Sequence, residues 1–134
     1  MTRLAWINVL LMALLVAHIF DHALNQPSRE IPFSGSFIGV AGFVLIAISA
    51  VLAVRRSSRA PIAAVAVGSI TAFGIVAVHV LPYWWGFVSD PYWDFEANAL
   101  TWIAALAPLF GGLLLASEGL RLIRLDPHTL GSPA

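Results

Sequence analysis

Residues 4–25 read LAWINVLLMALLVAHIFDHALN, an apolar run that ends in a polar segment. The run is long enough for a helix to cross about 30 Å of hydrocarbon, which needs roughly 20 residues. No small-x-small cleavage site follows it, so we interpret it as a retained span rather than a secretory signal. The polar segment places side chains at i, i+3, i+4 and i+7, on one face of a helix. These side chains are His18, Asp21, His22 and Asn25.

Three further apolar stretches follow, and together they predict four spans, over residues 4–24, 37–54, 62–81 and 98–120. The 134-residue chain is 60% hydrophobic and only 10% charged, which is a membrane composition. Strands are not expected, because the runs lack alternation and a membrane barrel needs at least about eight strands. The predicted fold class is all-α, a polytopic membrane protein with four transmembrane helices in an up-down-up-down bundle. Residues 1–124 are expected to form a single domain, followed by a tail over 125–134.

The arginines predict how the bundle is oriented. Six of the seven arginines lie before the first span, between the second and third spans, or after the fourth span. The up-down-up-down topology puts these three places on the same side of the membrane. The six arginines are Arg3, Arg55, Arg56, Arg59, Arg121 and Arg124. By the positive-inside rule this side is cytoplasmic. We therefore expect a multi-pass plasma-membrane protein with both termini and the tail in the cytoplasm. The absence of lysine and the abundance of alanine indicate a bacterial, GC-rich genome.

Charge and composition also exclude several classes of function. The formal net charge is zero, so the chain offers no basic surface for nucleic acid. Because it has no cysteine, it has no disulfide, thiolate metal site or cysteine nucleophile, and histidine and carboxylate are the remaining strong ligands. No serine-nucleophile motif occurs either, so we assign no catalytic residue and do not expect an enzyme. A membrane enzyme that acts on a lipid or quinone with a histidine base remains an alternative.

Small residues recur in the second and third spans. Gly35, Gly39 and Gly42 have the spacing that lets membrane helices approach closely. We expect this face to pack inside the same bundle, with a dimer seam as the alternative. In the third span, Gly68 and Ala72 share a helix face with His79, so that face is expected to pack against a neighbouring helix.

Residues 82–97 form an aromatic segment that is expected to lie on the outer membrane surface, because amphipathic rings prefer the headgroup layer. Asp90 and Pro91 read as the N-cap and first residue of a helix. A helix from there to Arg124 is longer than the bilayer core, which predicts a bend near Ala97 or Pro108. The tryptophans expected to cover the outer end as a lid are Trp84, Trp85 and Trp93.

A weak internal similarity links Val16–Ile19 with Ala77–Val80, at the outer ends of two spans that run in the same direction. It predicts that His18 and His79 lie at similar depth. Ionisable groups within a span usually face protein or a water-filled cavity, so the polar residues of the outer half should converge. We predict a transition-metal or haem b site at His18, His22 and His79. The residues expected to support it or to line its pocket are Asp21, Asn25, Asp94, Asn98 and Thr101.

Two other functions remain open. One is a small proton-linked transporter, because histidine beside a carboxylate can relay protons. The chain resembles small multidrug transporters in size and number of spans alone, and no acidic or basic residue lies deep in the inner half of any span. The other is a structural or accessory subunit without a ligand. Expected partners are the lipid bilayer and, beyond it, another membrane protein or a second copy in a homo-oligomer.

Overall fold

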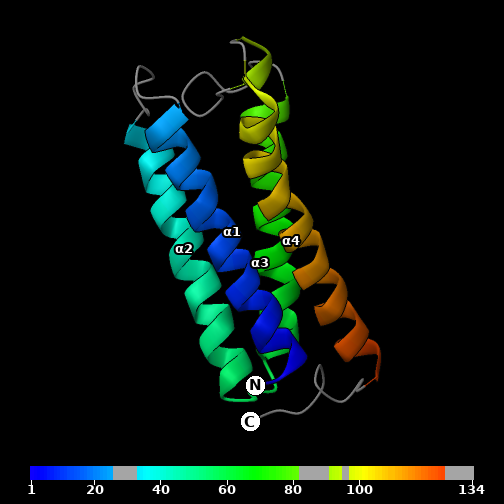
Figure 1. Ribbon diagram of the computed structural model, residues 1–134. Coiled ribbons are helices and arrows are strands. Elements are labelled where there is room, and N and C mark those ends of the chain that lie inside the picture. Colours follow the sequence, from blue (N-terminus) through cyan, green and yellow to red (C-terminus); the bar gives the residue numbers. More distant parts are fainter. Residues whose placement is uncertain (26–32, 82–90, 95–96, 126–134) are drawn as a thin grey trace.

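The computed structural model describes residues 1–25, 33–81, 91–94 and 97–125, except for the side chains of residues 33–38 and 94. Four α-helices run up, down, up and down (Figure 1). They are α1 (Arg3–Asn25), α2 (Phe33–Val54), α3 (Ala60–Ile75) and α4 (Ala99–Leu125). A π-helical turn, η1 (Val76–Val80), extends α3, and a 3₁₀ turn, η2 (Tyr92–Asp94), precedes α4. The all-α fold class is confirmed, with no strand in the described residues.

In the part of the chain that the structure describes, three helical segments are long and apolar enough to cross a membrane: Arg3–Asn25, Ala60–Val80 and Ala99–Leu125. The apolar part of α2 whose side chains are described, Gly39–Val54, is shorter. Large apolar side chains such as Phe110 face outward, as a bilayer rather than water requires.

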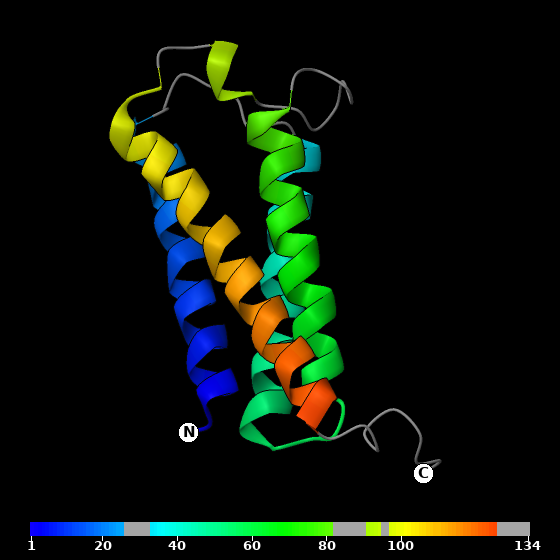
Figure 2. The same cartoon turned by 90° about the vertical axis from the view of Figure 1, so that its right-hand side faces the viewer.

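The closest helix packing joins α3 to α4, which crosses it at an angle (Figure 2). Glycines make this approach possible. A Cβ on Gly112 would lie 2.7 Å from the Gly68 carbonyl oxygen and 3.0 Å from the Ala72 nitrogen, and one on Gly119 would lie 2.6 Å from the Pro61 oxygen. The prediction that the small-residue face of the third span packs against a neighbour is confirmed.

The corresponding prediction for the second span is confirmed in one half of the helix and not at the glycines themselves. Among the described residues, a Cβ on Gly39 or Gly42 would meet nothing within 4 Å. The same face of α2 is buried nearer the arginine end, at Ile46, Ser49 and Ala53, so its close contacts are confined to that half. Small-residue spacing permits a close approach but does not require one. Gly35 lies among the residues whose side chains are not described.

The start of α4 differs from the expected helix over residues 91 onward. The chain makes the 3₁₀ turn η2, is non-helical at Ala97 and Asn98, and enters α4 at Ala99. The break near Ala97 is confirmed, whereas α4 continues through Pro108. Asn98 caps the helix, because its Oδ1 accepts a hydrogen bond from the Thr101 backbone N–H at 3.0 Å. The expected cap, Asp90, lies outside the described residues.

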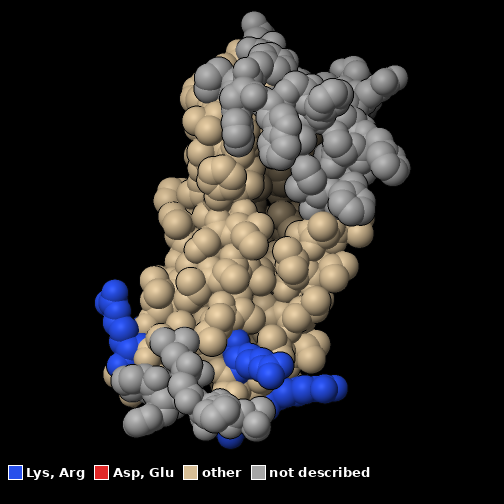
Figure 3. Space-filling model, turned by 180° about the vertical axis from the view of Figure 1, so that it is seen from behind, with Lys and Arg blue, Asp and Glu red and all other residues tan. Residues whose placement is uncertain are grey.

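The described arginines gather at the end of the bundle where α1 begins and α4 ends (Figure 3). There Glu118 is only 3% exposed and accepts two hydrogen bonds from the Arg121 guanidinium, at 2.8 and 2.9 Å. Arg3 of α1 lies 3.5 Å from the same carboxylate. These contacts link the ends of α1 and α4 and leave both guanidinium groups within reach of water or headgroups.

Candidate metal centre

Three histidines meet at the opposite end of the bundle. His18 and His22 lie one turn apart on α1, and His79 belongs to the turn η1. The Nε2 atoms of His18 and His79 are 3.2 Å apart, so one donates a hydrogen bond to the other. The depth expected for these two histidines from the sequence similarity is therefore confirmed. One ring nitrogen from each of the three histidines lies within 4.8 Å of the others.

The π-helical turn that carries His79 was not predicted from the sequence. Its backbone closes with a hydrogen bond from the Leu81 N–H to the Val76 carbonyl at 2.9 Å, over five residues instead of four. The wider turn changes the direction in which His79 projects relative to the small-residue face of α3. Such turns are rare and occur frequently at functional sites.

Tyr92 is the site residue that sequence reasoning missed. Its side chain is 1% exposed, and its hydroxyl oxygen lies 3.1 Å from Nε2 of His22. Its ring centroid is 4.5 Å from that of His79 and 5.4 Å from that of Trp102. The aromatic segment contains a second tyrosine, Tyr83, and nothing in the sequence distinguishes the two.

The predicted supporting residues divide into two groups. Asp21 is 6% exposed, and its Oδ1 accepts hydrogen bonds from the Thr101 hydroxyl at 3.4 Å and from the Asn25 amide at 2.5 Å. These bonds join α1 to the start of α4 beside the histidines. Asn98, by contrast, is exposed and serves as the cap of α4. The side chain of Asp94 is not described.

Of the three predicted lid tryptophans, Trp84 and Trp85 lie outside the described residues. Trp93 is 61% exposed, and its indole N–H donates a hydrogen bond to the carbonyl of Val80 at 2.6 Å. Its ring lies 4.8 Å from that of Trp102. Trp93 thus attaches η2 to the end of the π-helical turn, and this attachment helps to hold its neighbour Tyr92 over the histidines.

One pair of the three imidazoles already has the spacing of a metal site, and the third nitrogen lies within 4.8 Å of both. Two nitrogens bound to one tetrahedral zinc ion at about 2.0–2.1 Å are about 3.3 Å apart, which is close to the His18–His79 separation of 3.2 Å. The His18 ring lies against the backbone of Ala104, and its Nδ1 has no well-formed hydrogen bond among the described residues. A backbone carbonyl is a usual partner for the second nitrogen of a metal-binding histidine. The arrangement can therefore hold a metal ion.

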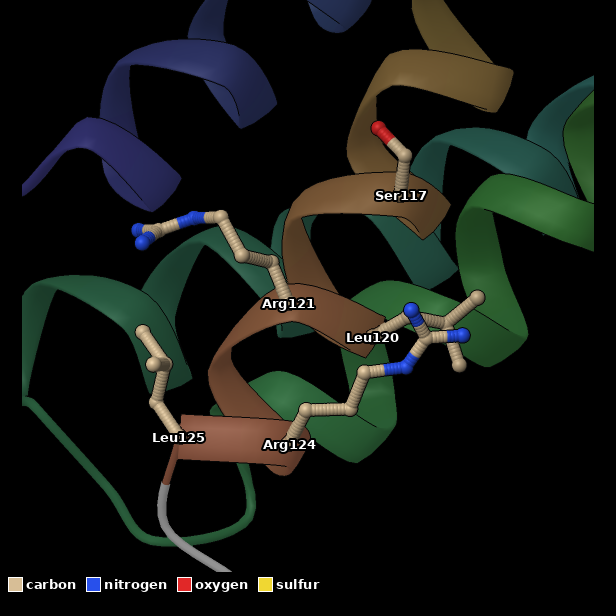
Figure 4. Close-up of a pocket in the computed structure, with 5 residues that line it drawn as sticks. All are labelled: Ser117, Leu120, Arg121, Arg124 and Leu125. Atoms are coloured by element: carbon tan, nitrogen blue, oxygen red, sulfur yellow. The ribbon is translucent and has the colours of Figure 1, made fainter.

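A surface hollow at the arginine end is not a second candidate binding site. Its lining comes entirely from α4, with Ser117, Leu120, Arg121, Arg124 and Leu125 (Figure 4). Arg121 and Arg124 point to opposite sides (Figure 4). Arg121 is already hydrogen-bonded to Glu118. No set of donors converges there on a common ligand.

Fold and site together define a class: a small membrane-type helical bundle with a histidine triad between two of its helical segments. Compared with known proteins, the chain matches no protein-family model, no curated protein and no solved structure. Its function must therefore be argued from the site.

Proposed function

We propose that this protein binds a transition-metal ion at His18, His22 and His79, near the outer surface of the plasma membrane. The observation that carries the proposal is the approach of three histidine nitrogens to within 4.8 Å of one another. Imidazole is a preferred ligand of zinc, copper and iron. Burying several imidazoles together is costly unless their nitrogens are satisfied, and a shared ion satisfies one nitrogen of each.

An ion fits this geometry better than haem does. Two axial histidines must leave room between them for the whole porphyrin ring. Here the ring centroids of His18 and His79 are 4.9 Å apart, with His22 at 4.8 Å from His18 and Tyr92 at 4.5 Å from His79. The glycines that could have made room, Gly68 and Gly112, instead bring two helix backbones together.

Binding is also favoured over proton-linked transport. On α1 the buried positions after His18 toward the cytoplasmic end are Leu15 and Leu11, and the next buried polar residue, Asn8, is about 15 Å away. On α4 every buried residue between Thr101 and Glu118 lacks a polar side chain. The described parts of these two helices offer no polar path across the bundle, as transport requires.

The test is a calorimetric titration of the detergent-solubilised protein with Zn²⁺ and with Cu²⁺. We expect one ion per chain in the wild type. Replacing a ligand, as in His79→Ala, should weaken binding by more than about 100-fold, since loss of a mere supporting contact costs 10–100-fold. The matched control is His128→Ala, which removes the fourth histidine of the chain and should leave binding unchanged.

The alternative, an accessory subunit without a ligand, predicts a different result. In that case the rings satisfy one another through contacts such as those of His18 with His79 and of Tyr92 with His22. The wild type would then bind neither metal above the level of His79→Ala, and this outcome would overturn the proposal.

A further inference from the structure

The hydroxyl oxygen of Tyr92 is a further donor atom beside the three histidines. It is 3.1 Å from Nε2 of His22, and the centroid of the tyrosine ring is 4.5 Å from that of His79 and 5.4 Å from that of Trp102. Because the side chain is 1% exposed, the hydroxyl faces the protein rather than lipid or headgroups. Its ring contacts fix the direction of the hydroxyl before any ion binds.

Ligand-to-ligand distances support this assignment. Two donors bonded to one ion at about 2.0–2.1 Å, with angles between square and tetrahedral, are separated by roughly 2.9–3.4 Å. The His18–His79 nitrogens are 3.2 Å apart, and the His22 nitrogen and Tyr92 oxygen are 3.1 Å apart. Each pair is thus already at a separation that a shared ion requires, and the three histidine nitrogens, which lie within 4.8 Å of one another, would draw closer as the ion binds.

We propose that Tyr92 is the fourth ligand and binds as a phenolate, so that the site prefers Cu²⁺ to Zn²⁺. This inference rests on the proposed metal-binding function. The phenol releases its proton as the oxygen–metal bond forms, so binding follows Tyr92–OH + M²⁺ → Tyr92–O–M⁺ + H⁺. His22, whose Nε2 is hydrogen-bonded to this hydroxyl before the ion binds, is half-buried, and the released proton passes to the solution.

Charge explains why a phenolate suits this place. Three neutral imidazoles leave the full double charge of the ion inside an apolar bundle, which is costly. The phenolate removes one charge, and the carboxylate of Asp21, within electrostatic reach of His18, offsets the second. Copper binds such nitrogen and oxygen sets more tightly than zinc in the general order of affinities.

The experiment compares wild type, Tyr92→Phe and the matched control Tyr83→Phe, titrated with CuCl₂ in detergent at weak buffering. Phenylalanine keeps the ring contacts with His79 and Trp102 and removes only the hydroxyl. We expect a phenolate-to-copper charge-transfer absorption in the wild type and in Tyr83→Phe that is absent in Tyr92→Phe. The wild type should also release about one more proton per copper than Tyr92→Phe.

Titrating the same proteins with Zn²⁺ tests the selectivity between the two metals. The wild type should bind Cu²⁺ more tightly than Zn²⁺, and Tyr92→Phe should lose more affinity for Cu²⁺ than for Zn²⁺, with the α-helical circular dichroism unchanged. Copper binding without the absorption, with equal proton release in wild type and Tyr92→Phe, would overturn the role of Tyr92 and leave the histidine site standing. Failure of the wild type to bind either metal would overturn the proposed function itself.

Discussion

The two ends of this bundle are built differently. At the arginine end α3 and α4 approach through glycines, and an ion pair closes the contact between α1 and α4. At the histidine end the helices depart from regular geometry, with a π-helical turn, a 3₁₀ turn and a cluster of buried rings. Close packing thus supports the fold at one end, and polar side chains converge at the other. The comparison teaches that stability and ligand binding can be changed separately in this chain.

At the packed end, the change expected to disturb the fold most is Gly119→Ala. The added Cβ would lie 2.6 Å from the backbone oxygen of Pro61 in α3, which cannot move independently of its helix. We expect a loss of about 1–3 kcal/mol in the free energy of unfolding, measured by thermal denaturation in detergent. The control Gly42→Ala, where a Cβ meets nothing within 4 Å, should be neutral or stabilising. Equal destabilisation by both variants would contradict the packing described here.

At the histidine end, Asp21→Asn should weaken metal binding while the protein stays folded. The carboxylate lies beside the triad and joins α1 to α4 through Thr101. We expect the affinity for Zn²⁺ or Cu²⁺ to fall by about 10–100-fold in a calorimetric titration. The matched variant at the other end, Glu118→Gln, removes a buried carboxylate of similar burial and should leave the affinity unchanged. If both variants weaken binding alike, the two ends are not independent.

The smallest expected effect concerns the connection between α2 and α3. Arg56 has a positive φ of 52°, and Ser57 N–H donates to the Leu52 carbonyl across the end of α2. Glycine adopts this conformation without the strain of a side chain. Arg56→Gly should raise the free energy of unfolding by about 0.5–1 kcal/mol. Arg55→Gly, at a position without positive φ, should not stabilise the fold; if it does so equally, backbone strain is not the cause.

Much of the fold follows from the sequence because the bilayer limits the choices. Apolar runs of span length predict helices, and helical periodicity alone puts His18 and His22 on one face. The depth of His79 follows from topology. The bilayer constrains the segments between the spans less. A continuous helix from Pro91 would place Asn98 on the same face as Thr101. In the structure Asn98 is not helical, and its side chain caps the first turn of α4 instead.

The missed features share a physical cause, since they depend on contacts between distant segments. The π-helical turn at Val76–Val80 has no marker in its own residues, since valine and alanine occur throughout the apolar helices of this chain. Tyr92 gains its role from three neighbours in three different segments, α1, η1 and α4. The spacing of Gly39 and Gly42 says only that a neighbour could approach, and none does in the described structure.

The central claim is that three histidines from two helical segments bind one ion. X-ray absorption spectroscopy of the zinc-loaded protein tests it most directly, because imidazole rings give a recognisable pattern of outer-shell scattering. We predict about three imidazole nitrogens at about 2.0–2.1 Å from the zinc. A spectrum with oxygen neighbours alone, or one unchanged by His79→Ala, would contradict the account.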